Sequence, residues 1–362
     1  MTTFESRRAA VEARHAVAAR PTSGSEHEAA LQKYLAASSY LAHLTEATDP
    51  AGAEQQPTVL TEPVHANVRP AAAADLVVAG IEGSACARGA ASWAADEAQR
   101  RGGSLLLVYC YVLPPVGLSG YNPYPPNVVD DLRAEGCAVL ADTESELRRT
   151  HPGLRVSTRM IYGDAKKVLA RTSSGAALTV VGAHGRNRVG MALGSVACRL
   201  AHANPAPVAV VRPGTLNASG PVVVGVDGSP SSDQALSFAF RTAAARGASV
   251  LAVHCWQGPV VDGLPPRLGP ESATESPAAQ QARAVFAERL ERHSAEHPTV
   301  DVELVVMHER PTPALLRHAE NAQLMVVGTR GHNPLSEMML GSTGQALITR
   351  SAAPVVVVPA LP

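Results

Sequence analysis

Residues 222–256 read VVVGVDGSPSSDQALSFAFRTAAARGASVLAVHCW, and this stretch decides the fold because the chain contains it twice. Residues 77–111, VVAGIEGSACARGAASWAADEAQRRGGSLLLVYCY, align with it without a gap. The later parts repeat as well, since VVGAHG at 180–185 answers VVGTRG at 326–331. A repeating unit of about 145 residues has the size of a domain. The sequence therefore predicts a duplicated domain and not a solenoid.

Each copy opens with the pattern of a strand, a turn and a helix. In the second copy, the β-branched run 222–226 stops at Asp-Gly-Ser, and apolar residues then recur at helical spacing through 235–243. Arg246-Gly247 is a helix stop, and residues 250–253 form the next strand. A strand that is apolar along its whole length is typical of a parallel sheet covered by helices on both faces.

Helices and strands continue to alternate through the rest of the second copy. The predicted elements are a helix at about 276–297, a strand at 302–306, a helix at 313–319, a strand at 324–327, a helix after Gly341 and a terminal strand at 354–358. Five strands joined by helices predict an α/β fold with right-handed crossovers in each copy.

Composition excludes several classes of partner. The 362 residues are 46% apolar, enough for two cores, and no apolar run approaches the roughly 20 residues that cross a membrane. A net charge of −1, without a basic stripe and with few aromatic residues, argues against nucleic acid. Residues 1–20 carry Arg and Glu throughout and lack the apolar core of a signal peptide. We expect a soluble, cytoplasmic protein.

The five cysteines fit a reducing compartment. They are odd in number and have no C-x-x-C spacing. Cys110 and Cys255 occupy equivalent positions on the second strand of each copy, which admits a redox role, but a buried cysteine commonly acts as a small apolar side chain. We favour the packing interpretation.

Phosphate binding through a P-loop is excluded. Lysine occurs only at 33, 166 and 167, and no GxxxxGK[ST] motif is present. Glycine-rich turns that lead into a helix offer backbone N–H groups and the positive end of the helix dipole instead. The second copy has such a turn, in which Gly328-Thr329-Arg330-Gly331 is followed after nine residues by Gly341-Ser342.

These motifs resemble the universal stress protein family in its tandem-domain, ATP-binding form. The resemblance rests on Val-Asp-Gly-Ser at 226–229, Gly-x2-Gly-x9-Gly-Ser at 328–342 and the terminal Ala-Pro-Val-Val-Val-Val. It implies two Rossmann-like domains, each a five-stranded parallel sheet in the order 3-2-1-4-5, with ATP at the carboxyl ends of the strands. The implied contacts in the second copy are Gly225, Val226, Asp227, Val253, Gly328, Arg330, Gly331, Gly341, Ser342 and Thr343.

The first copy departs from this pattern in two places. Glu82 stands where the family has aspartate, and only eight residues separate Gly185 from Gly194-Ser195. The site that corresponds there comprises Glu82, Gly182, Gly185, Gly194 and Ser195. Two interpretations stay open, a weakened or differently selective nucleotide pocket and a domain kept only to pair with the second copy.

The expected organisation has four parts: an extension at 1–70 that is mostly flexible with a helix at 25–44, a divergent domain at 71–213, a linker at 214–220 and a domain with the intact motif at 221–362. The helix at 25–44 either docks a protein partner or packs on its own domain. The two domains are expected to pack face to face through their terminal strands as a pseudo-dimer within one chain. Further association between chains stays open.

Three functions fit the sequence. The first is an ATP-binding regulator of the stress response that changes its surface with nucleotide occupancy. The second is a module that binds AMP or a cyclic nucleotide, or a scaffold without nucleotide. The third is a slow ATPase, although no nucleophile with an adjacent general base is visible. No metal-ligand spacing stands out, and Mg²⁺ would enter only with ATP, against Asp227.

Overall fold

The computed structural model describes residues 75–113, 128–184, 195–212, 214, 219–256, 277–329 and 341–360. The predicted extension at 1–70, its helix at 25–44 and most of the linker lie outside these residues. The strands of both repeats lie in one compact unit, Pro63–Tyr111 together with Glu135–Pro362. Residues 112–134 belong to a second unit.

The first repeat contains five strands and four helices among its described residues. They are β1 (Leu76–Ile81), α3 (Ala85–Arg100), β2 (Ser104–Tyr111), α4 (Val128–Thr150), β3 (Arg155–Tyr162), α5 (Ala165–Thr172), β4 (Leu178–Gly182), α6 (Ser195–Ala203) and β5 (Val208–Val211).

The second repeat has the same order of elements. They are β6 (Val222–Val226), α7 (Pro230–Arg246), β7 (Val250–Cys255), α9 (Pro277–Glu296), β8 (Val302–Met307), α10 (Pro311–Ala319), β9 (Leu324–Gly328), α11 (Ser342–Arg350) and β10 (Val355–Val358). Each predicted strand and helix of this repeat is confirmed, with ends that shift by one or two residues.

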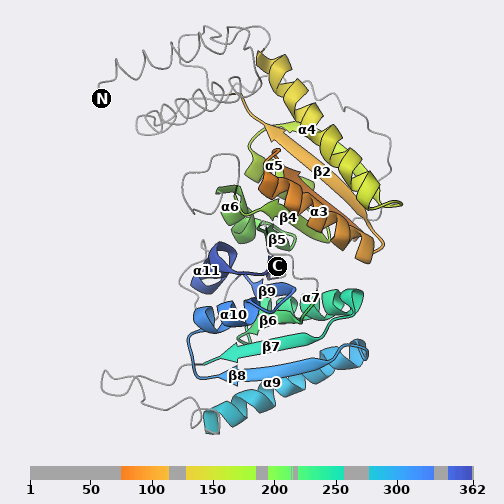
Figure 1. The fold of residues 1–362 in the computed structure, drawn as a ribbon. Coiled ribbons are helices and arrows are strands. Elements are labelled where there is room, and N and C mark those ends of the chain that lie inside the picture. Colours follow the sequence, from red (N-terminus) through yellow and green to blue (C-terminus); the bar gives the residue numbers. More distant parts are fainter. Residues whose placement is uncertain are drawn as a thin grey trace, which may run out of the picture. The chain divides into compact units, whose positions relative to one another are not determined.

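The strand order is 3-2-1-4-5 in each repeat, as the family resemblance implied. The full order is β3-β2-β1-β4-β5-β10-β9-β6-β7-β8, and strands within a repeat run parallel (Figure 1). The repeats join edge to edge, because β10 pairs antiparallel with β5, Val356 opposite Ala209. The prediction that the terminal strands make the contact is confirmed, but the packing is not face to face.

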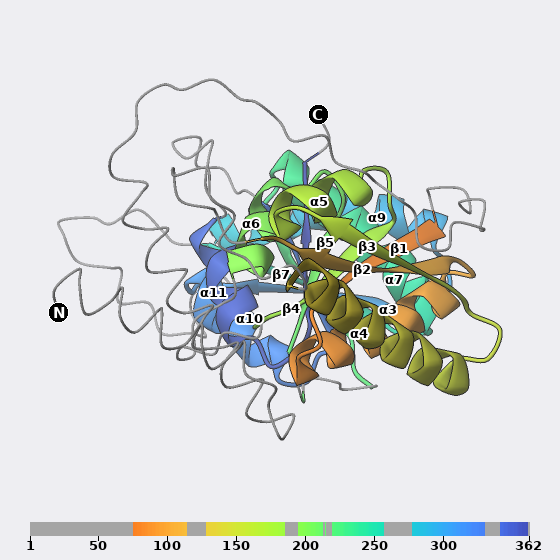
Figure 2. The ribbon, with the colours of Figure 1, turned by 90° about the horizontal axis from the view of Figure 1, so that it is seen from above.

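Helices cover both faces of the sheet. Alternate residues of β1 point to opposite faces, so Val77 packs with α3 in one apolar cluster and Val78 packs with α5 and α6 in the other. In the second repeat, α7 and α9 lie on the first face, and α10 and α11 on the second. Figure 2, seen from above, shows the strands of the first repeat between α3 and α5.

Local residues explain where the first helix of each repeat begins and ends. Ser84 caps α3 by accepting from the N–H of Ala87, and Ser229 caps α7 by accepting from that of Ser232. Gly247 ends α7 in the left-handed conformation, with φ of 62°. No described helix is long and apolar enough to cross a membrane.

Candidate functional site

Asp227 follows β6, where the strands of the second repeat have their carboxyl ends, and is built into the turn there. Its Oδ1 accepts hydrogen bonds from the Ser229 N–H at 2.9 Å and from the Ser229 hydroxyl at 2.6 Å. Gly228 between them has φ of 84°, which favours glycine. The half-buried carboxylate is therefore held in a fixed position beside the start of α7.

Gly328 lets the end of β9 approach the start of α7. A Cβ at this position would lie 2.5 Å from the Ser231 Oγ and 2.8 Å from the Ser231 carbonyl carbon. Only glycine fits such a contact. β6 and β9 are neighbours in the sheet although the chain leaves β6 toward β7, so this is the point where the strand order reverses. Ligands of open α/β sheets bind at such points.

The predicted glycine loop has both of its ends beside this point. Arg330, Gly331 and residues 332–340 lie outside the described residues. Before the loop, the Thr329 N–H donates to the Val358 carbonyl at 3.0 Å. After it, the Gly341 N–H donates to the Thr329 carbonyl at 3.2 Å, which holds the start of α11 next to the end of β9.

The first turn of α11 therefore faces the carboxyl edge. Gly341 precedes the helix with φ of −53° and ψ of 145°, and no side chain caps it. Ser342 and Thr343 are the first two helical residues, exposed and half-buried respectively. The first N–H groups of a helix have no partner within it, so they and the helix dipole favour an anion.

On β7, Val253 and its neighbour His254 have different surroundings. The Val253 side chain is buried in the apolar cluster on the α10 and α11 face. His254 lies at the edge instead, with Nδ1 2.9 Å from the carbonyl oxygen of Val226 and its ring 4.3 Å from that of Phe286. His254 thus fixes the end of β6, immediately before Asp227.

The first repeat builds the same turn from different side chains. Gly83 has φ of 87°, and Ser84 caps α3 at 3.1 Å from the Ala87 nitrogen. A Cβ on Gly182 would lie 2.9 Å from the Cys86 Sγ, so Cys86 takes the place that Ser231 has in the second repeat. Glu82 is half-buried at the position of Asp227.

Of the other predicted residues of the first site, Gly185 and Gly194 lie outside the described residues. Ser195 begins α6. Gly225 and Val226 of the second site lie within β6.

An arginine binds the carbonyl of the turn glycine in each repeat, but it comes from a different helix. Arg88 of α3 donates to the Gly83 carbonyl at 2.7 Å. Arg289 of α9 donates to the Gly228 carbonyl at 3.3 Å and to the carboxylate of Asp233 at 2.7 Å. Sequence reasoning did not identify Arg289 or Ser231, although the repeat offset pairs Ser231 with Cys86. It did include His254, with Val253 and Cys255, among the residues at the end of the second strand.

The surroundings of Cys110 and Cys255, on the second strand of each repeat, favour a packing role over redox chemistry. Burial, with a smaller effect of Asp164, raises the pKa of Cys110 to about 12. Burial, followed by Glu309 and opposed by Arg317, raises the pKa of Cys255 to about 11. Both thiols therefore stay protonated at neutral pH, and a thiol in that state is a poor nucleophile.

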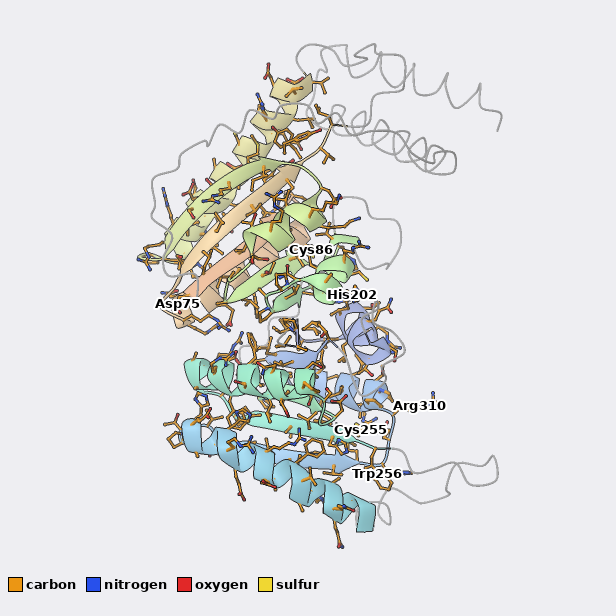
Figure 3. All side chains as sticks on the ribbon, turned by 180° about the vertical axis from the view of Figure 1, so that it is seen from behind. Asp75, Cys86, His202, Cys255, Trp256 and Arg310 are labelled. Atoms are coloured by element: carbon orange, nitrogen blue, oxygen red, sulfur yellow. The ribbon has the colours of Figure 1, made fainter. Side chains whose placement is uncertain are left out.

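The residues after these cysteines are aromatic in both repeats. Tyr111 packs edge-on to Tyr162, with ring centroids 5.5 Å apart. Trp256, labelled at the end of β7 in Figure 3, has its ring 4.5 Å from that of His308. The carboxyl end of each second strand is thus followed by a pair of packed rings. Within the described part of the chain, no three His, Cys, Asp or Glu side chains group to hold a metal ion.

Comparison with known proteins assigns both repeats to the same family. The sequence model described as "Universal stress protein family" matches residues 73–212 and again residues 219–359. A curated relative, Universal stress protein Rv1996 of Mycobacterium tuberculosis, is 32% identical over 304 residues, which cover 78% of this chain and 94% of the relative.

Solved structures are similar as well. A universal stress protein from Archaeoglobus fulgidus matches 79% of this chain and 96% of its own, with 18% identity and a TM-score of 0.59. A universal stress protein crystallised in complex with cAMP matches 40% of this chain and all of its own, with 27% identity and a TM-score of 0.31.

Proposed function

We propose that this chain, which belongs to the universal stress protein family, binds ATP at the carboxyl edge of its second repeat and acts as a nucleotide-dependent regulator in the stress response. The observation that carries the proposal is the junction of three elements. The end of β6 at Asp227, the close approach at Gly328 and the start of α11 at Gly341 all lie where the strand order reverses.

The parts of this junction suit different parts of a nucleotide. Asp227 and the backbone around it would meet the adenosine portion, because a fixed carboxylate accepts from ribose hydroxyls. The N–H groups of Ser342 and Thr343 would receive the phosphates at the positive end of α11. Mg²⁺ would accompany the phosphates, since it is commonly held by one or two carboxylates together with phosphate oxygens.

A regulatory role agrees with the chemistry of the described residues better than catalysis does. The Asp227 Oδ1 accepts from Ser229, and the thiols of Cys110 and Cys255 are held protonated.

Under this proposal, residues 71–213 form a divergent domain and residues 221–362 form the nucleotide-binding domain of a cytoplasmic protein. Its five cysteines, all described, are free thiols, as in a reducing compartment.

The test is titration calorimetry and native mass spectrometry of the purified full chain with ATP and Mg²⁺. One ATP per chain, lost on Gly331→Ala or Asp227→Ala, is the expected result. Two would show that the first repeat binds as well. No binding by a folded parent chain would overturn the proposal.

The second candidate is a module that binds AMP or a cyclic nucleotide, or a scaffold that binds no nucleotide. Competition between nucleotides separates it from the first, because a site whose donors are placed for a triphosphate binds a nucleotide without the terminal phosphates more weakly. A slow ATPase is the third. Its turnover must fall in both Asp227→Ala and Ser342→Ala, whereas an unchanged rate in both would identify a contaminant.

A further inference from the structure

The helices α3 and α7 meet across the boundary between the repeats through residues at equal positions of the duplication. The guanidinium of Arg101 stacks over the ring of Phe238 at 5.2 Å, and that of Arg246 stacks over the ring of Trp93 at 5.6 Å. The repeat offset pairs Arg101 with Arg246 and Trp93 with Phe238. The two repeats thus present the same patch to each other, as in the contact of a two-fold dimer.

One pair of positions breaks this symmetry. Arg246 donates from Nη2 to the Glu97 Oε1 at 2.6 Å. In the symmetric direction, Arg101 donates from Nη2 to the Thr242 hydroxyl at 3.3 Å. Glu97 and Thr242 are equivalent in the duplication, and each is only 2% exposed. Each arginine therefore reaches the same place on the opposite helix, but only the first repeat has a carboxylate there.

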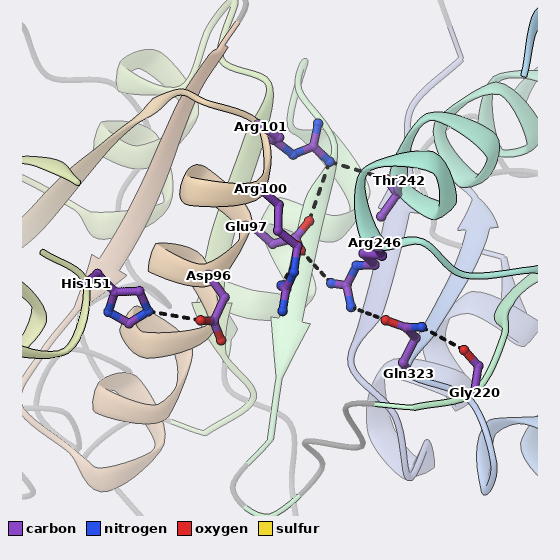
Figure 4. A network of polar contacts seen from close by, with 9 residues as sticks. All are labelled: Asp96, Glu97, Arg100, Arg101, His151, Gly220, Thr242, Arg246 and Gln323. Atoms are coloured by element: carbon purple, nitrogen blue, oxygen red, sulfur yellow. Dashed lines mark hydrogen bonds and ion pairs between the residues drawn. The ribbon is translucent and has the colours of Figure 1, made fainter. Parts of the chain in front are cut away.

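The contact extends from Glu97 to the end of the linker, as Figure 4 shows. Glu97 also pairs with two arginines of its own repeat, Arg100 at 3.1 Å and Arg101 at 3.6 Å. Arg246 donates from Nη1 to the Gln323 Oε1 at 2.9 Å, and Gln323 donates from Nε2 to the Gly220 carbonyl at 2.7 Å. The carboxylate of the first repeat is thus connected to the residue where the chain enters the second.

Breaking a buried ion pair of this kind costs more than the intact pair contributes to stability. The Arg246 side chain is 5% exposed, and burial lowers its pKa while Glu97 opposes that shift. Removing one partner of such a pair leaves a buried charge, which is costly, whereas the intact pair often gives little net stabilisation. If two second repeats paired in the same geometry, two copies of Arg246 would face two copies of Thr242.

We propose that the single carboxylate at Glu97, opposite Thr242, makes α3 the preferred partner of α7, because pairing between two second repeats would leave both copies of Arg246 facing Thr242. The partner that the α7 surface selects is the first repeat of the same chain. This selection rests on the geometry of the duplication, and it holds whether or not the second repeat binds a nucleotide.

Exchanging the two residues tests the proposal in the full chain. Glu97→Thr leaves Arg246 without a carboxylate, and the melting temperature is expected to fall by about 5–15 °C. Asp96→Asn is the matched control on the same helix, because Asp96 is partly exposed and pairs with His151 outside the boundary. It is expected to shift the melting temperature by less than about 3 °C.

The double variant E97T/T242E is the decisive one, because it moves the carboxylate to α7, where Arg101 faces it. At least half of the loss should be regained. T242D, one methylene shorter, replaces T242E where the longer side chain prevents folding. A double variant as unstable as Glu97→Thr, with either acid, would overturn the proposal.

Refolding measures the selection itself. T242E alone makes the second repeat complementary to another copy of itself, since Arg246 would then find a carboxylate on a second α7. After refolding at high protein concentration, the fraction of dimer seen by native mass spectrometry should rise severalfold over the parent. An unchanged fraction for both T242E and T242D would show that position 242 does not control the choice of partner.

Discussion

The two repeats close their first turn with the same glycine and serine but with different acids. Gly83 and Gly228 both have positive φ, and Ser84 and Ser229 both cap the following helix. Asp227 takes two hydrogen bonds from Ser229, whereas its counterpart is the longer Glu82. The shared residues therefore build the same turn in both repeats, and the position that differs is where binding is to be sought.

The largest difference between the repeats is expected from their close-approach glycines. A Cβ at Gly328 meets the backbone of Ser231 at 2.8 Å, whereas a Cβ at Gly182 meets the Cys86 Sγ at 2.9 Å and its carbonyl carbon at 3.2 Å. Gly328→Ala should lower the free energy of unfolding by about 2–3 kcal/mol, and Gly182→Ala by about 1–2 kcal/mol. Denaturant unfolding of both variants gives the comparison, and equal losses would contradict it.

Exchanging the acids should exchange the affinities. Asp227→Glu removes the two bonds to Ser229 and is expected to weaken ATP binding about tenfold, or about 1.4 kcal/mol. Glu82→Asp is the reciprocal change and should strengthen any binding at the first repeat. Calorimetric titration of each variant measures both effects. If Asp227→Glu binds ATP like the parent, the turn carboxylate has no part in recognition.

A smaller effect is expected from Arg212, a residue of the first repeat that contacts the second. Arg212 follows β5 and donates to the carbonyls of Ile348 and Thr349 in the last turn of α11. The residue that follows the equivalent strand β10 is Pro359, which has no side-chain donor. Arg212→Met should weaken ATP binding about two- to fivefold through the helix whose start would hold phosphate. Adenosine binding should not change, and Arg212→Lys should retain most of the affinity. Equal losses for ATP and adenosine would contradict this role.

The smallest difference is expected between the two strand thiols. Iodoacetamide at pH 8 should label the exposed Cys137 and leave Cys110 and Cys255 unlabelled. Because their pKa values are raised from 9.0 to about 12 and about 11, their contribution to stability is complete below pH 9 and is lost as pH rises toward those values. Mass spectrometry of the labelled chain identifies the modified cysteines, and rapid labelling of Cys110 or Cys255 at pH 8 would disprove the prediction.

Local patterns in the sequence predicted the elements, and the family resemblance implied their order. The run 222–226, the Asp-Gly-Ser turn and Gly247 each act through neighbouring residues, so they can be recognised in one sequence. The contacts of Arg246 with Glu97 and of Arg289 with Gly228 join residues 149 and 61 positions apart. A single sequence carries no signal for such pairs.

One signal of the interface was nevertheless present in the duplication. Arg101 and Arg246 share a position, as do Trp93 and Phe238. A cation and an aromatic ring at matching places on two copies are the residues expected of a surface that meets itself. The asymmetry at Glu97 and Thr242 could be given a meaning only once the structure had brought the two helices together.

The antiparallel pairing of β5 with β10 determines the directions from which the two repeats can be approached. All strands of the first repeat run opposite to those of the second, so their carboxyl ends lie at opposite margins of the ten-stranded sheet. If each repeat bound a nucleotide, a protein docked on one margin would contact the nucleotide of one repeat only. Two occupied repeats would act as two independent outputs, unless the change at one margin is transmitted along the strands to the other.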